Sequence, residues 1–132
     1  MTLRPLVVVA IVLALASCAR MAPPGDTRSP RDTGVDVIEN QVIVVDQEPI
    51  PVHGANVVIK WRLDATGGWL FPPTNAIVFR DAPAGEFIEC RTIADGKQVT
   101  CKDKGSKGKY KYDITVVRGT EMLKVDPFVW NL

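Results

Sequence analysis

The chain has 132 residues and carries 16 basic against 15 acidic side chains, which gives a formal net charge of +1. This balance excludes a protein that binds nucleic acid through a strong excess of positive charge. The only histidine, His53, stands between Val52 and Gly54 in a proline-rich stretch. One imidazole is too few for most metal centres, so we predict no metal site and no cofactor.

The first 17 residues have the layout of a signal peptide. Arg4 places a positive charge ahead of an unbroken apolar run from residue 6 to residue 15. A helix of that length rises about 15 Å, half of a bilayer core of about 30 Å. The run is therefore too short to span a membrane, and its length is typical of the apolar part of a signal peptide.

The four residues Leu15-Ala16-Ser17-Cys18 follow this run and resemble the lipobox of bacterial lipoproteins. The resemblance implies cleavage after residue 17 and acyl chains, such as palmitate, on Cys18. Several chains hold a protein firmly to a membrane. Since Ala19 is not the aspartate that retains lipoproteins in the inner membrane, the resemblance further implies the periplasmic side of the outer membrane in a Gram-negative source. The alternatives are an ordinary secretory signal and a retained membrane helix.

Residues 18–34 are predicted to be the lipidated cysteine followed by a flexible tether. The segment from Ala19 to Gly34 holds three prolines and two glycines and has no apolar periodicity. Such a segment cannot bury enough surface to offset its conformational entropy, so we predict a disordered spacer. A short proline-rich recognition segment is the alternative.

Residues 35–132 are predicted to form one domain whose apolar residues alternate with a period of two. The alternating apolar positions are Val57, Ile59, Trp61 and Leu63, then Tyr110, Tyr112, Ile114 and Val116, and finally Leu123 and Val125. Turn signals recur between these runs, and no window has the pattern of an amphipathic helix. This pattern predicts a small, all-β antiparallel sandwich.

The hairpin around Asp95-Gly96 carries the two remaining cysteines. Asp-Gly is a favoured two-residue turn, and counting outward from it places Cys90 opposite Cys101, within disulfide reach. Export supplies an oxidising compartment, so we predict this disulfide. The same count puts Ile88 on one face with Val99 and both cysteines. It also makes the two cysteines a hydrogen-bonded pair, the pair type with the larger Cα–Cα distance, and a bulge would change this pairing. A redox-active pair is the alternative, although such pairs favour the spacing Cys-X-X-Cys.

Gly108 and Tyr110 have the spacing of a tyrosine corner, and this segment resembles the penultimate strand of immunoglobulin-like sandwiches. The resemblance implies about seven strands and a Tyr110 hydroxyl that bonds back to the preceding loop. Tyr112 stands where antibody domains have a core cysteine, so the chain is not an antibody-type domain. Cupredoxin-like sandwiches share this strand style, which leaves the topology open, but one histidine cannot supply a type 1 copper site.

Catalysis has no support in the sequence. The nucleophile motif Gly-X-Ser-X-Gly is absent, and Ser29 and Ser106 lie in the tether and in a Lys/Gly loop without an evident base. We therefore predict that the chain is not an enzyme.

Lysines and aromatic residues make up the candidate binding surface. Its members are Lys102, Lys104, Lys107, Lys109, Phe128 and Trp130. The lysines can bind an acidic partner, or simply protect an edge strand from aggregation. Both aromatic residues share the parity of Lys124 and Asp126, so they are predicted to point outward unless Pro127 reverses the alternation.

These features predict a non-enzymatic accessory or interaction module on an envelope lipoprotein. It would reach the membrane through its N-terminal lipid and bind an envelope protein through a sheet edge or through the aromatic residues. One alternative is an inhibitor of an envelope-attacking hydrolase, which would present the exposed loop within residues 102–109. Another is a carrier of a small ligand, which needs an interior cavity.

Overall fold

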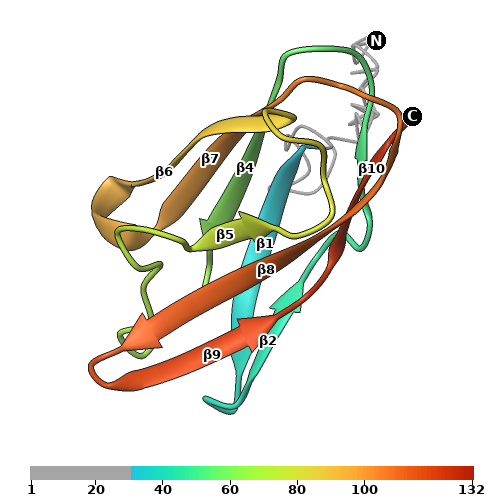
Figure 1. The fold of residues 1–132 in the computed structure, drawn as a ribbon. Helices are drawn as coiled ribbons and strands as arrows, with labels where there is room; N and C mark the ends of the chain where they lie inside the picture. The colour runs from blue at the N-terminus through green and yellow to red at the C-terminus, as the bar shows by residue number, and fades with distance from the viewer. Residues whose placement is uncertain (1–30) are drawn as a thin grey trace, which may run out of the picture.

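The computed structural model describes residues 31–132, and in this part the chain is all β (Figure 1). The predicted signal peptide, Cys18 and residues 19–30 of the predicted tether lie outside the described residues. The strands are β1 (Asp32–Ile38), β2 (Val42–Val45), β3 (Ile50–Val52), β4 (Val57–Leu63), β5 (Ile77–Phe79), β6 (Phe87–Ile93), β7 (Gln98–Asp103), β8 (Gly108–Arg118), β9 (Glu121–Val125) and β10 (Phe128–Asn131). Residues 31–132 include no helix that is long and apolar enough to cross a membrane.

The strands form two sheets, which confirms the predicted sandwich. One sheet has the order β2-β1-β4-β7-β6, and the other has the order β3-β10-β8-β5, with β9 also paired to β8. Strands β4, β7 and β6 thus lie in one sheet and β5, β8 and β10 in the other. Residues 31–132 thus form ten strands, more than the seven or so predicted.

Both sheets are mixed rather than purely antiparallel. Strand β1 runs parallel to β4, and β3 runs parallel to β10. Parallel neighbours need a long connection between them. Here the chain supplies one by forming β2 beside β1 and then crossing to the other sheet as β3 before it enters β4. The alternation of apolar residues predicts strands but carries no information on which strands become neighbours.

Strand β1 begins inside the predicted tether, so the predicted domain boundary at residue 35 is too late. Lys60 donates its backbone N–H to the carbonyl of Arg31 at 3.0 Å, and Gly34 donates to the Asp46 carboxylate at 2.9 Å. Thr33 is fully buried. Composition alone assigns such small, polar residues to a tether because the sheet neighbours that bind them are distant in sequence.

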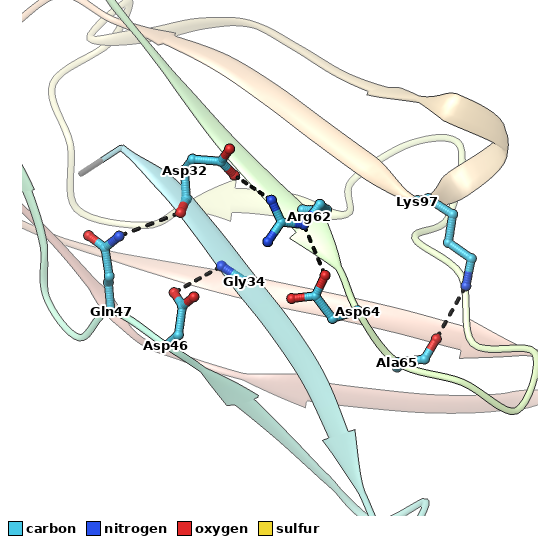
Figure 2. Close-up of polar contacts among 8 residues, drawn as sticks. All are labelled: Asp32, Gly34, Asp46, Gln47, Arg62, Asp64, Ala65 and Lys97. Carbon is cyan, nitrogen blue, oxygen red and sulfur yellow. Dashed lines mark hydrogen bonds and ion pairs between the residues drawn. The ribbon is translucent and has the colours of Figure 1, made fainter. Parts of the chain in front are cut away.

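Polar side chains attach the start of β1 to its neighbours (Figure 2). The Arg62 guanidinium lies between Asp32 and Asp64, with N–O distances of 3.5 and 2.9 Å. Gln47 donates to the carbonyl of Asp32 at 3.5 Å. The chain therefore enters the domain at the sheet that contains β1 and β4.

The space between the sheets is filled by a cluster of aromatic rings. Trp61 of β4 and Tyr112 of β8 are fully buried, and the indole N–H of Trp61 donates to the Tyr112 hydroxyl at 3.1 Å. Phe79 and Phe87 stack with their centroids 3.5 Å apart. All four inward positions predicted for β4 are buried. The Trp61–Tyr112 contact therefore links the two sheets through the core.

The cysteine hairpin confirms the predicted turn and the predicted disulfide. Asp95 and Gly96 both have positive φ, and the N–H of Lys97 donates to the carbonyl of Ala94 at 3.0 Å. Pairing continues outward to Arg91 opposite Thr100, as counted from the turn. Cys90 and Cys101 then form the disulfide.

A bulge next to the disulfide corrects the predicted position of Ile88. The register of β6 shifts between Ile88 and Arg91, where Glu89 has a φ of 54°. Ile88 therefore pairs with Lys102 on the outer face, and Phe87 packs against the core instead. Because side chains alternate with a period of two, one extra residue moves every following residue to the other face.

Candidate interaction surface

The outer face of the β3-β10-β8-β5 sheet carries both aromatic residues of the predicted binding surface. Trp130 pairs with Lys109 and Phe128 pairs with Lys111. Between and beside the two rings, Val129 and Asn131 point inward and are 0% and 3% exposed, whereas Trp130 is 48% exposed. The pairing of β8 keeps one register through β9 and β10, so Pro127 does not reverse the alternation. The predicted outward parity is confirmed.

We call this surface the Trp130 face. It consists of Pro51, Lys109, Lys111, Phe128 and Trp130. The Lys109 ammonium lies 4.4 Å from the centroid of the Phe128 ring, and that of Lys111 lies 5.9 Å away. Lys111 also pairs with Asp126 at 2.7 Å, and this hydrogen bond lowers the pKa of Asp126. The face therefore combines aromatic area with positive charge, a combination common in protein-binding sites.

The structure divides the other predicted surface residues into two places. Lys104 and Lys107 are exposed in the loop of residues 104–107, which follows β7. Lys102 belongs to the other sheet, where it pairs with Val58 and Ile88 on the opposite outer face. Lys102 is thus not part of the Trp130 face. The sequence analysis grouped Lys102 with this face because it is close along the chain to the other lysines of the predicted surface.

The loop of residues 104–107 is tied down by the predicted tyrosine corner. The Tyr110 hydroxyl donates to the carbonyl of Ser106 at 2.9 Å and lies 3.2 Å from that of Lys107. Gly108 has a φ of 151°, and a Cβ added there would lie 2.9 Å from the Tyr110 hydroxyl oxygen. A larger residue would displace the hydroxyl, so the Gly-X-Tyr spacing is needed for this corner.

A buried group of polar side chains lies between this loop and the end of β10. We call Glu86, Asp103 and Asn131 the carboxyl cluster. The Asn131 amide donates to Asp103 Oδ1 at 2.9 Å and to the carbonyl of Ser106 at 2.9 Å, and lies 3.4 Å from Glu86 Oε1. The backbone N–H groups of Gly105 and Ser106 donate to Asp103 and Glu86 at 2.8 and 2.7 Å. The cluster therefore binds the loop to the strand that carries Trp130.

The two carboxyl groups of the cluster have opposite pKa shifts. Burial raises the pKa of Asp103 to about 6, against the hydrogen bonds from Gly105 and Asn131, and the neighbouring Glu86 adds to the rise. Burial also acts to raise the pKa of Glu86, but hydrogen bonds from Ser106, Asp103 and Gly105 together lower it. Asp103 therefore keeps its proton to a higher pH than Glu86 does.

Sequence reasoning missed the carboxyl cluster, although one signal for it was present. Asp103 continues the inward positions of Val99 and Cys101, so strict alternation places a carboxyl group in the interior. Glu86 precedes β6 and Asn131 is near the C-terminus, and nothing in the local sequence brings them together. His53 is exposed just after β3, and residues 31–132 contain no group of three His, Cys, Asp or Glu side chains that could hold a metal ion.

Comparison of the chain with protein-family models and with curated proteins finds no match.

Proposed function

We propose that this protein is a non-enzymatic, lipid-anchored interaction module of the bacterial cell envelope and that its Trp130 face binds an envelope protein. The observation that carries the proposal is a half-exposed tryptophan on a strand whose flanking residues are both buried. Tryptophan is among the residues that contribute most to protein interfaces, above all where other aromatic and basic residues surround it.

The rigidity of β10 supports this use of Trp130. The strand is hydrogen-bonded on both sides, to β8 and to β3, and Asn131 is held by the carboxyl cluster. The backbone of Trp130 is therefore ordered before any partner arrives. Fixing this residue in a complex therefore costs little conformational entropy.

The position of the chain entry is compatible with a lipid anchor at Cys18. Strand β1 lies in the sheet opposite the one that carries the Trp130 face. Fully extended, residues 19–31 reach at most about 45 Å. An anchored domain can therefore stand off the membrane and keep the Trp130 face accessible. In a Gram-negative source, the proposed location is the periplasmic side of the outer membrane.

The test has two parts. Mass spectrometry of the native protein should find an N-terminal acylated Cys18, and a Cys18→Ser variant should lack the acyl groups. Cross-linking in intact cells should then capture a partner with the wild type and lose it with Trp130→Ala. The matched control is Met122→Ala, which removes a side chain that is 59% exposed on β9. Equal capture by wild type and Trp130→Ala would exclude the Trp130 face.

A second candidate function, inhibition of an envelope-attacking hydrolase, is favoured by the loop of residues 104–107. The hydrogen bonds of Tyr110 and of the carboxyl cluster fix its backbone, while Lys104 and Lys107 remain exposed. A rigid basic loop fits an acidic active-site cleft. In that case, charge reversal by Lys104→Glu and Lys107→Glu would abolish inhibition, whereas Trp130→Ala would leave it unchanged. A ligand carrier has less support, since the aromatic cluster occupies the space between the sheets.

A further inference from the structure

One oxygen of the carboxyl cluster is buried without a donor. Asp103 is fully buried, and its Oδ1 accepts from Gly105 and Asn131, but its Oδ2 has no N–H partner among the described residues. A buried carboxylate oxygen without a donor is costly. The carboxyl of Glu86 meets it at the same buried amide, since Asn131 Nδ2 lies 2.9 Å from Asp103 Oδ1 and 3.4 Å from Glu86 Oε1. Two carboxyl groups can hydrogen-bond to each other only when one of them holds a proton.

The basic side chains near the cluster do not neutralise its two carboxyl groups. Lys104 and Lys107 of the loop are exposed, and Lys102 lies on the outer side of β7. Within residues 31–132, no basic side chain forms an ion pair with Glu86 or Asp103.

The other titratable group facing the cluster is Tyr110 of β8. Its pKa is raised by burial first and then by the charges of Glu86, Asp103 and Asp81. The neutral hydroxyl of Tyr110 cannot offset a second negative charge. Asn131 contributes an amide and no charge. A proton is therefore the group that balances the two carboxyl groups.

We propose that Glu86 and Asp103 share one proton, and that this proton holds the loop of residues 104–107 and the end of β10 in place. Loss of the proton leaves two negative charges in one buried cluster. Their repulsion weakens the contacts of Asn131 and Ser106 and so loosens the backbone beside Trp130. As a regulator of partner binding this device rests on the proposed function, whereas the shared proton itself does not.

The direction of the pH dependence follows from the two carboxyl groups. The pKa of Asp103 is about 6 in the folded chain and about 3.9 in an unfolded one. Between these values the folded state binds more protons, so stability falls as pH rises through about 6. The lowered pKa of Glu86 acts oppositely, and its contribution is lost below about pH 4. The domain should therefore be most stable in mildly acidic solution.

Thermal unfolding of the full chain in detergent, measured across pH, tests the predicted pH dependence of stability. The wild-type Tm should be highest near about pH 4, should fall as pH rises through about 6, and should level off above about pH 7. In Asp103→Asn, an amide replaces the protonated carboxyl and can still donate to Glu86, so the fall should disappear. The control is Asp95→Asn, which changes an exposed acid at a turn where asparagine tolerates the positive φ. It should keep the wild-type profile.

Tryptophan fluorescence gives a second readout at the surface. Trp61 and Trp69 are 0% and 1% exposed, so acrylamide quenching reports mainly on Trp130. Quenching should increase through about pH 6 in the wild type and stay constant in Asp103→Asn.

If Asp103→Asn fails to fold, NMR titration of the carboxyl carbons in the wild-type protein measures the pKa values of Glu86 and Asp103 directly. Ordinary pKa values for both Glu86 and Asp103 would overturn the proposal, as would an unchanged fall of Tm in a folded Asp103→Asn variant. These measurements need neither a partner nor an acyl chain. A failure of the proposed function would therefore leave their outcome unaffected, and the two failures can be told apart.

Discussion

The two ends of β8 show two different ways of closing a sandwich. At the start of the strand, Tyr110 and the carboxyl cluster fill the end with buried polar groups. At the far end, Trp69 is 1% exposed and the Arg118 guanidinium lies 4.5 Å from the centroid of its ring. The Trp69 indole N–H and Arg118 both donate to the side chain of Asn40, at 3.0 and 2.9 Å.

The difference lies in what each closure depends on. Burial of the Trp69 ring is apolar and changes little with pH. The carboxyl cluster depends on hydrogen bonds, which are directional and therefore fix the orientation of the β10 backbone. It also depends on one proton, so its stability changes with pH. The end next to the exposed Trp130 is thus the one whose order can be altered by solution conditions.

The largest effect should come from the apolar end. Trp69→Ala removes a buried ring and leaves a cavity, and it should lower the free energy of unfolding by about 3–5 kcal/mol. Chemical denaturation measures this loss. Its size should be the same at mildly acidic and at neutral pH, because Arg118, which packs on the ring, stays charged throughout this range. A loss confined to one of these pH values would show that the two ends are coupled.

The disulfide should have the next largest effect. Cys90 and Cys101 are 11 residues apart, and closing such a loop stabilises a fold by roughly 3 kcal/mol. A Cys90→Ala/Cys101→Ala double variant should lose that amount in chemical denaturation. Since the disulfide constrains mainly the unfolded chain, the pH profile of Tm should keep its shape. A flattened profile would mean that the disulfide also holds the carboxyl cluster.

A smaller loss is expected at the polar end from Tyr110→Phe. The variant removes the hydrogen bond to Ser106, which should cost about 1 kcal/mol. Amide hydrogen exchange should show faster exchange in residues 104–108, while the amides near Trp69 keep their protection. Uniformly faster exchange throughout the domain would contradict the view that the two ends close independently.

The smallest effect on stability should come from Trp130→Ala. The ring is 48% exposed, so the free energy of unfolding should change by no more than about 0.5 kcal/mol. Partner binding should instead weaken by about 2 kcal/mol or more if Trp130 is central to the interface. Titration of the captured partner measures that difference. A large loss of stability would make Trp130 a structural residue and would count against the Trp130 face.

Local patterns were enough to predict much of this domain. Alternation of apolar residues predicted the buried face of β4 and the outward direction of Trp130, and the Asp95-Gly96 turn predicted the pairing that joins Cys90 to Cys101. The resemblance of the segment around Gly108 and Tyr110 to immunoglobulin-like sandwiches implied the tyrosine corner. Each of these depends on residues within one strand or one hairpin, where side-chain direction follows from the period of the strand.

The tertiary structure alone decided the rest. It placed β1 parallel to β4, moved Ile88 outward through a bulge, and brought Glu86, Asp103 and Asn131 into one cluster. These features depend on pairings between segments far apart in the chain. Such pairings are selected by the packing of the whole sandwich, and a buried carboxyl group finds its partners only when the sheets come together.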